Sequence, residues 1–259
     1  MKNIAIIGYG RFGELLSRLL STNYTIYVVE NDSTNAEAAK NEGYDVIELA
    51  DIRQCDTVIF AVPISAIEQV VKEAANYINE GHLVMDICSV KVHPANVMRR
   101  HLPDTQIIAT HPMFGPDSAS NGFAGLQVAI CPITANDDFV QEVDAAWKKL
   151  GVETLLTTPE QHDKDAVLSQ SFTYSLAKLI LNMNIPEVTL TTRSFNALRE
   201  VARLSANDSE QLFHDMLYYN PYFAQMKQEL QRSIDATLDV LGQIEREQEA
   251  SKIFKDSGL

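Results

Sequence analysis

Short apolar segments alternate with helical segments through the first part of the chain, and this alternation constrains the fold more than any other feature. Strands separated by helices pair in parallel, and right-handed crossovers place the helices on both faces of the sheet. The expected strands lie at 3–7, 25–30, 57–61, 83–87, 106–109, 127–130 and 152–156, and the expected helices at 12–21, 36–41, 65–78, 95–101 and 137–150. The sequence therefore predicts a doubly wound α/β domain with a parallel sheet over residues 1–157.

From residue 158 onward, long helical periodicity replaces this pattern, and we expect a second, all-helical domain over residues 158–259. A polar tail at 251–259 is expected to fray. The last helix carries an apolar stripe made of Phe223, Met226, Leu230, Ile234, Leu241 and Ile244. Because a domain of this size has a thin core, we expect the stripe both to pack within the domain and to form a homodimer interface.

Composition limits the classes of function. The 259 residues are 46% hydrophobic and 22% charged, which is typical of a soluble globular protein. A net charge of −14 argues against nucleic acid or an anionic membrane as partner, since both require a basic face. Neither a membrane span nor a cleavable signal is evident, so we expect a cytoplasmic protein. Cys55, Cys88 and Cys131 are expected to be buried, reduced thiols without the spacing of a metal site.

A glycine-rich motif occupies the first expected turn. Residues 8–13 read Gly-Tyr-Gly-Arg-Phe-Gly and lie directly between a strand and a helix. Gly8 permits a tight turn, Gly10 lets the backbone approach a pyrophosphate, and Gly13 lets the helix pack on the strand. The first helical amides would face the phosphates, with Arg11 and Phe12 among the cofactor contacts. The alternative is a plain glycine-rich turn.

Glu30 ends the second expected strand, where a carboxylate accepts hydrogen bonds from the ribose hydroxyls of NAD. A 2′-phosphate would be repelled by Glu30 and Asp32, so we expect NAD rather than NADP. The alternative is a surface acid with no cofactor role. Val62 and Pro63 follow the next strand at the same crevice and are candidates for the cofactor wall.

Two further segments follow expected strands at this crevice. One contains Ser89-Val90-Lys91, and the other begins at His111 and reads His-Pro-Met-Phe-Gly-Pro-Asp-Ser. Together with the glycine motif, these segments resemble those of the bacterial prephenate dehydrogenases of tyrosine biosynthesis. The resemblance covers the whole chain and is strongest over residues 86–125. It implies an NAD-dependent oxidative decarboxylation of prephenate to 4-hydroxyphenylpyruvate, with arogenate as the alternative substrate.

His111 is the candidate catalytic base, because a neutral imidazole accepts a hydroxyl proton while hydride leaves the same carbon. The alternative is a loop histidine with a structural hydrogen bond. In the family, a serine matching Ser89 supports the same hydroxyl and the nicotinamide; a helix N-cap is its other expected role. Lys91 either attracts substrate carboxylates or covers the start of a helix.

The substrate implied by the resemblance carries two carboxylates, which an acidic protein must hold with local cations. Residues 202–208 resemble the arginine-containing segment of the family, so Arg203 is expected to bind a carboxylate in a bidentate manner. Arg199 lies four residues earlier on the same helix face and is inferred from helix geometry alone. The alternative is an ordinary surface ion pair between Arg203 and Glu200.

One segment departs from the family pattern. Many members have a histidine in the first helix of the second domain, whereas residues 169–174 here read Ser-Gln-Ser-Phe-Thr-Tyr. This leaves open the choice between prephenate and arogenate, and feedback inhibition by tyrosine. Other dehydrogenases of this two-domain shape would lack the His-Pro-Met-Phe-Gly-Pro loop, and a non-catalytic NAD sensor would not need Ser89, His111 and Arg203. Given the chain length, we expect no fused mutase or regulatory domain.

Overall fold

The computed structural model describes residues 2–120 and 122–256. The chain divides into two compact units, residues 1–221 and 222–259. The first unit holds the sheet together with the helices that follow it, up to residue 221, and the second is built on one long helix. A boundary between a sheet domain and a helical domain near residue 157 therefore stays a prediction.

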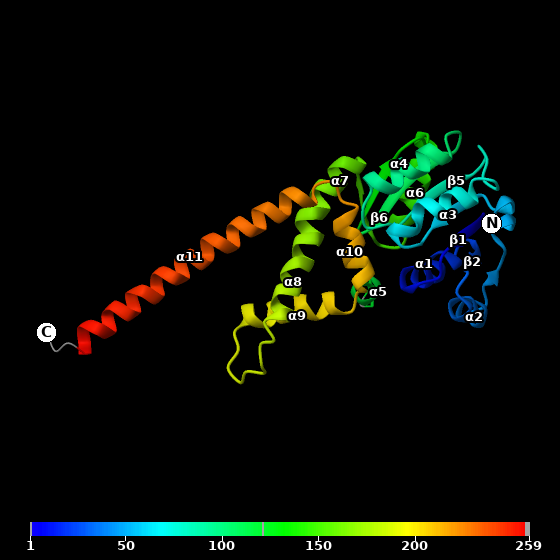
Figure 1. Cartoon of the computed structure of the whole chain (residues 1–259). Coiled ribbons are helices and arrows are strands. Elements are labelled where there is room, and N and C mark those ends of the chain that lie inside the picture. The colour runs from blue at the N-terminus through cyan, green and yellow to red at the C-terminus, as the bar shows by residue number, and fades with distance from the viewer. Residues whose placement is uncertain (1, 121, 257–259) are drawn as a thin grey trace. The chain divides into compact units, whose positions relative to one another are not determined.

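The first unit contains the sheet, several of whose strands are labelled in Figure 1. Among the described residues it has eight strands, in the order β3-β2-β1-β4-β5-β6-β7-β8. The strands are β1 (Asn3–Ile7), β2 (Thr25–Val29), β3 (Asp45–Val46), β4 (Thr57–Phe60), β5 (Leu83–Asp86), β6 (Gln106–Pro112), β7 (Gln127–Pro132) and β8 (Glu153–Leu156). Neighbouring strands are parallel except for β6 and β7. The predicted α/β class is confirmed, with one antiparallel pair in the sheet.

The antiparallel pair follows from a short connection. Between β6 and β7 the described residues, 113–120 and 122–126, form a single helix, α5 (Pro116–Ala119), of four residues. A parallel crossover normally needs a longer helix to cross the face of the sheet, so the chain turns back beside β6 instead. The pairing places His111 opposite Ala129 in the register.

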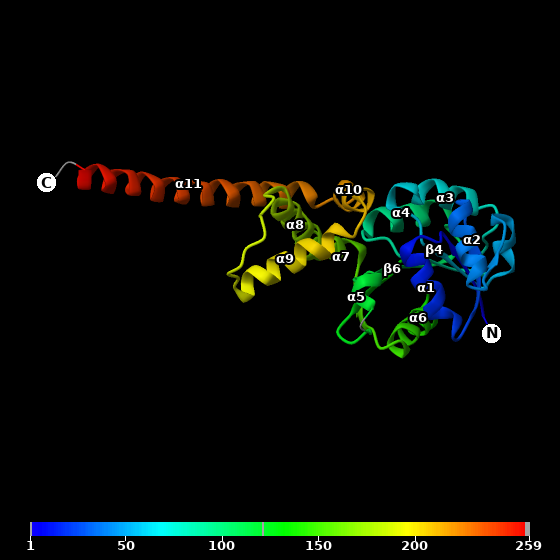
Figure 2. The same cartoon turned by 90° about the horizontal axis from the view of Figure 1, so that it is seen from below.

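Helices cover both faces of the sheet (Figure 2). They are α1 (Arg11–Ser21), α2 (Ser33–Asn41), α3 (Ile67–Ala74), α4 (Val92–His101) and α6 (Asp137–Lys149). Successive residues of a strand point to opposite faces. Ile4 and Ile6 accordingly pack in the cluster with α1 and α6, whereas Ala5 and Ile7 pack in the cluster with α3 and α4. Burial on both faces explains why these strands read as continuous apolar runs.

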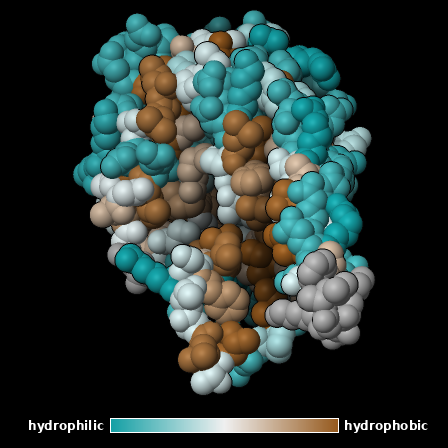
Figure 3. Space-filling view, turned by 90° about the vertical axis from the view of Figure 1, so that its left-hand side faces the viewer, coloured by the Kyte–Doolittle hydropathy of each residue, from teal (hydrophilic) through white to brown (hydrophobic). Residues whose placement is uncertain are grey.

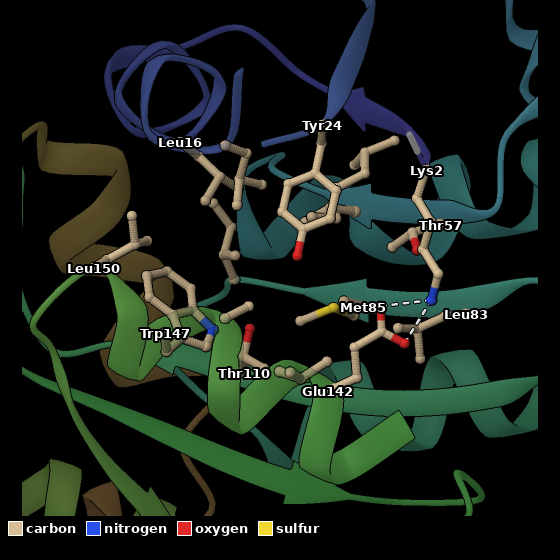
Figure 4. A pocket seen from close by; sticks show the side chains of 16 residues that line it. Lys2, Leu16, Tyr24, Thr57, Leu83, Met85, Thr110, Glu142, Trp147 and Leu150 are labelled. Atoms are coloured by element: carbon tan, nitrogen blue, oxygen red, sulfur yellow. Dashed lines mark hydrogen bonds and ion pairs between the residues drawn. The ribbon is translucent and has the colours of Figure 1, made fainter. Parts of the chain in front are cut away.

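An apolar cavity of about 60 Å³ lies in the core beneath α1 and α6 (Figure 4). Leu16, Met85 and Trp147 contribute to its lining, and the ion pair between Lys2 and Glu142 lies at its edge. The residues predicted for catalysis or cofactor binding are absent from this lining. The cavity is therefore a gap in core packing rather than the candidate site. The three cysteines are free and buried, as predicted.

The remaining helices of the first unit are α7 (Pro159–Ala166), α8 (Phe172–Asn182), α9 (Arg193–Ala206) and α10 (Glu210–Tyr218), with a π-helical segment at Val167–Ser171. The helices α8 and α9 lie side by side (Figures 1 and 2). Side chains cap three of the helix starts: the oxygens of Thr158, Thr192 and Ser209 accept hydrogen bonds from Gln161, Phe195 and Leu212 N–H groups.

The second unit contains α11 (Phe223–Asp256), 34 residues long. It includes residues 251–256, where the sequence predicted a frayed tail; the rest of that tail, 257–259, lies outside the described residues. Leu238, Leu241 and Ile244 are 58%, 55% and 46% exposed. Apolar side chains at the molecular surface are visible in Figure 3. Among the described helices, none combines the length and apolar character needed to cross a membrane.

Candidate functional site

The predicted cofactor and catalytic residues gather at one edge of the sheet. Gly8 follows β1, Glu30 follows β2 and Val62 follows β4, while Ser89 follows β5 and His111 lies near the end of β6. These strands run in parallel, so their carboxyl ends meet at the same edge. This is the edge where ligands bind in doubly wound folds.

The glycine loop has the shape of a phosphate cradle. Gly8 has a φ of +103°, and a Cβ there would lie 2.5 Å from the Ala61 carbonyl oxygen. A Cβ at Gly13 would lie 2.3 Å from the Gly8 carbonyl oxygen. By contrast, a Cβ at Gly10 would meet no heavy atom of the described chain within 4 Å beyond its neighbours. Gly8 and Gly13 therefore serve backbone packing, whereas the surroundings of Gly10 are open enough for a ligand to approach the backbone.

Glu30 joins the end of β2 to this loop. Its carboxylate accepts hydrogen bonds from the Tyr9 N–H at 2.7 Å and the Asp32 N–H at 2.8 Å. A carboxylate offers about four lone-pair positions, so two remain for ribose hydroxyls. The position of Glu30 at the end of β2 and its two remaining acceptor sites fit its predicted role of binding the adenosine ribose.

Arg11 and Phe12 connect the glycine loop to the segment after His111. Arg11 donates to the Asp117 carboxylate at 2.9 Å and to the Asn207 carbonyl at 3.0 Å. The Phe12 ring lies 6.0 Å from the ring of Phe114. The cofactor loop, the loop after β6 and the end of α9 are thereby held together. In this structure the Arg11 guanidinium is engaged by protein groups.

His111 is the first member of a buried hydrogen-bonded chain. It is 2% exposed, and its Nδ1 lies 2.8 Å from Nε2 of His162 on α7. Nδ1 of His162 in turn lies 2.8 Å from Oδ1 of Asp163. Neither His162 nor Asp163 was predicted from the sequence to belong to the site. The only local signal was a His-Asp pair after the capped helix start at Thr158, and nothing in the spacing linked it to His111.

The surroundings of His111 favour its neutral form. Burial lowers the pKa of His111 well below its ordinary value, and the nearby His162 and Lys91 lower it further. The ring is therefore uncharged near neutral pH and retains a lone pair. A neutral imidazole at the ligand-binding edge of the sheet is suited to accept a proton.

Ser89 and Lys91 lie between β5 and α4. Ser89 is half-buried, and its predicted role as a helix N-cap is wrong: α4 has Lys91 at its N-cap position. The Asp163 carboxylate supplies the cap instead, because it accepts hydrogen bonds from the N–H groups of Lys91 at 2.6 Å and Val92 at 2.9 Å. The α4 start is thus capped by Asp163, which is distant in the sequence, and not by the neighbouring Ser89.

The Lys91 side chain is fully buried. Its ammonium donates hydrogen bonds to the Asp86 carboxylate and to the Thr110 carbonyl oxygen. Both partners belong to the sheet, so the ammonium is held inside the protein. This placement favours a structural role over the attraction of substrate carboxylates.

Arg203 and Arg199 both lie exposed on α9. The Arg203 guanidinium donates to the Glu200 carboxylate through Nε at 2.9 Å and Nη2 at 2.7 Å. This pair and the nearby Asp117 raise the pKa of Arg203 above its ordinary value. The structure thus contains the surface ion pair that was the alternative to substrate binding, and it places that pair on the helix whose end contacts Arg11.

Residues 16–156, more than half of the chain, match the family model for the nucleotide-binding domain of prephenate dehydrogenase. Residues 179–253 match a model described as a TYRAAT1-like C-terminal domain. The described residues include no group of three or more His, Cys, Asp or Glu side chains that could hold a metal ion.

Two curated relatives are chloroplastic arogenate dehydrogenases of Arabidopsis thaliana. Arogenate dehydrogenase 2 is 25% identical over 232 residues, which cover 84% of this chain and 64% of that protein. Arogenate dehydrogenase 1 is 25% identical over 228 residues, which cover 84% of this chain and 36% of that protein. The chain thus spans less than two thirds of the length of either relative.

A solved structure shares the fold. Prephenate dehydrogenase from A. aeolicus, in complex with hydroxyphenyl propionate and NAD+, has a TM-score of 0.77 to this chain at 18% sequence identity. The match covers 99% of this chain and 96% of that one. The arrangement of sheet and helices is therefore that of a known dehydrogenase.

Proposed function

Because this chain belongs to the prephenate dehydrogenase family, we propose that it catalyses the NAD-dependent oxidative decarboxylation of prephenate to 4-hydroxyphenylpyruvate in tyrosine biosynthesis. The observation that carries the proposal is the neutral, buried His111 at the same sheet edge as the glycine cradle. Arogenate is the second candidate substrate, because the relatives named above are arogenate dehydrogenases and residues 169–174 contain no histidine.

The cradle accounts for cofactor binding. Gly10 would admit the pyrophosphate, Glu30 would accept from the adenosine ribose, and Val62 and Pro63 would form a wall. The acidic Glu30 favours NAD over NADP, since it would repel a 2′-phosphate. When bound, NAD supplies the acceptor for the hydride.

Side chains of the protein would transfer the hydroxyl proton of the substrate and bind its carboxylates. His111 would accept the proton of the ring hydroxyl while hydride leaves the same carbon, with Ser89 orienting that hydroxyl. Loss of the ring carboxylate as CO₂ then returns an electron pair to the ring, and the proton goes back to the oxygen as the ring becomes aromatic. Hydride and CO₂ are the net losses from the substrate.

Arg203 would hold a substrate carboxylate by exchanging one carboxylate partner for another. Its present partner, Glu200, is three residues away on an exposed helix face, where an ion pair contributes about 0–1 kcal/mol. A substrate carboxylate that is shielded from water would bind the same two N–H groups more strongly. Arg199, on the same face, would add positive charge.

The activity is tested by following NADH or NADPH absorbance with the purified protein, using prephenate and arogenate in turn, each with NAD and with NADP. Turnover with prephenate and NAD supports the proposal, and turnover with arogenate alone selects the second candidate. If no combination reacts although NAD binds, the protein is another dehydrogenase or a non-catalytic sensor.

Gly10→Ala and Gly13→Ala are expected to separate cofactor binding from folding. Gly10→Ala should change the free energy of unfolding by less than about 1 kcal/mol, because the added methyl enters open space. It should nevertheless weaken NAD binding about tenfold or more, because that space would hold the pyrophosphate. Gly13→Ala should lose stability as well, since its methyl meets backbone. Urea unfolding and calorimetric titration with NAD measure the two effects; unchanged NAD affinity in Gly10→Ala would contradict the cradle.

We also propose that α11 pairs with a second copy of the chain. Leu241 is 55% exposed on the apolar stripe of a helix whose other exposed positions are mostly polar. Leu241→Glu should therefore convert a dimer into a 28.9 kDa monomer in sedimentation experiments. Gln243→Glu adds the same charge on another side of the helix and should leave the dimer intact. A monomeric wild-type protein would exclude this proposal.

A further inference from the structure

A chain of hydrogen bonds runs from His111 to the start of α4 and joins three elements of the first unit. His111 lies on β6, His162 and Asp163 lie on α7, and the Asp163 carboxylate accepts from two N–H groups at the start of α4. His162 is 4% exposed and Asp163 is fully buried. The Asp163 carbonyl oxygen also accepts a hydrogen bond from Asn220 at 2.9 Å. The chain is therefore shielded from water and held at several points.

The direction of each hydrogen bond in this chain follows from its last member. Both carboxylate oxygens of Asp163 already accept backbone N–H groups, so Asp163 is an acceptor toward Nδ1 of His162 as well. When the His162 ring carries one proton, that proton lies on Nδ1 and Nε2 has a lone pair. His111 must then donate from its own Nδ1 to make the 2.8 Å contact. Its remaining lone pair lies on Nε2.

We propose that Asp163 and His162 are positioning residues that hold His111 in the tautomer with the proton on Nδ1, so that Nε2 accepts the substrate proton. This rests on the proposed function for the identity of the substrate. The tautomer itself is a property of the protein alone. In the opposite tautomer Nε2 would carry a hydrogen and could only donate, and His111 would fail as a base.

The groups facing this chain support the assignment. The buried Lys91 is the cation near His111, and its ammonium is neutralised by Asp86 on β5. From α7 come His162 and the Asp163 carboxylate. A second proton on the His111 ring would place a further cation in this buried space, which is consistent with the lowered pKa of His111. With a single proton on Nδ1, His111 makes the hydrogen bond to His162 without adding a positive charge to this buried space.

Asp163→Asn tests the proposal with little change in shape. With its oxygen toward the Val92 N–H, the Asn amide places its NH₂ group at the position of Oδ1, where it gives up the hydrogen bond from the Lys91 N–H and donates to Nδ1 of His162. His162 would then donate from Nε2 to His111, and the His111 proton would move to Nε2. We expect kcat to fall about 10²–10⁴-fold while KM for NAD stays nearly constant. Asp165→Asn makes the same substitution at an exposed position of α7 and should leave kcat unchanged.

The tautomer is read without any turnover, from ¹⁵N chemical shifts of the histidine ring nitrogens at a pH where His111 is neutral. His111→Asn identifies the His111 signals by their loss. The wild type should show a protonated Nδ1 and an unprotonated Nε2, and Asp163→Asn should show the reverse. A wild-type His111 protonated at Nε2 would overturn the proposal, whatever the protein's activity.

A second pair of variants covers the case in which Asp163→Asn does not fold. In His162→Gln, the amide oxygen can still accept from Nδ1 of His111, whereas His162→Leu has no acceptor. We expect His162→Gln to retain more of the wild-type kcat than His162→Leu, and equal losses would contradict the positioning role. If the wild type converts neither prephenate nor arogenate, the proposed function fails, and the ring-nitrogen shifts still decide the tautomer.

Discussion

His111→Asn is expected to lower kcat by about 10²–10⁴-fold, because the variant loses the group that accepts the hydroxyl proton. NAD affinity should stay within about twofold of the wild type, since the glycine loop and Glu30 are untouched. Steady-state kinetics and calorimetric titration with NAD measure the two quantities separately. His82→Asn is a matched control, because His82 is also buried but precedes β5, at the opposite end of the strand from the site.

The pH profile of the wild type gives an independent check on the same residue. His111 is an acceptor only while neutral, and burial together with His162 and Lys91 lowers its pKa. As the pH falls, kcat should therefore stay constant past the ordinary histidine value of about 6.5 and decline only below it. A decline already centred at or above about 6.5 would contradict the buried, neutral base, and near-normal turnover by His111→Asn would remove the assignment altogether.

The fold was accessible from the sequence because its signals are local. A strand buried on both faces is a run of apolar residues, and the glycine motif falls within six consecutive positions, 8–13. The predicted bounds of an element were wrong where a polar group, and not an apolar pattern, determines where the element begins. The second helix begins at Ser33 rather than at residue 36, because the Asp32 carboxylate accepts from the N–H groups of Thr34 and Asn35. The two-residue strand β3 is too short to leave a pattern.

The candidate site was less accessible, because contacts between distant residues complete it. His111 could be proposed from its strand end and the loop that follows it. Its partner His162 is 51 residues away, and the Asp163 carboxylate caps a helix more than 70 residues earlier. Periodicity and spacing carry no information on such pairs. Lys91 is a further example. The sequence shows that this residue carries a charge, but it does not show that the buried Asp86 carboxylate neutralises that charge.

Lys91→Met is expected to lower the free energy of unfolding by about 3–5 kcal/mol. The Asp86 carboxylate would then lie buried without its cation. One of its oxygens, Oδ1, already lacks a hydrogen-bond partner among the described residues, while Oδ2 keeps only the Cys88 N–H at 2.9 Å. Urea unfolding monitored through Trp147 fluorescence reports the change without interference, since the sequence contains one tryptophan.

The double variant Asp86→Asn/Lys91→Met distinguishes a structural ion pair from a substrate contact. If the two charges mainly neutralise each other in the core, removing both should recover most of the stability lost in Lys91→Met, because no unpaired charge remains buried. If Lys91 instead attracts substrate carboxylates, Lys91→Met should fold with a loss below about 1 kcal/mol and raise the KM for substrate severalfold. The fully buried ammonium between Asp86 and Thr110 leads us to expect the first outcome.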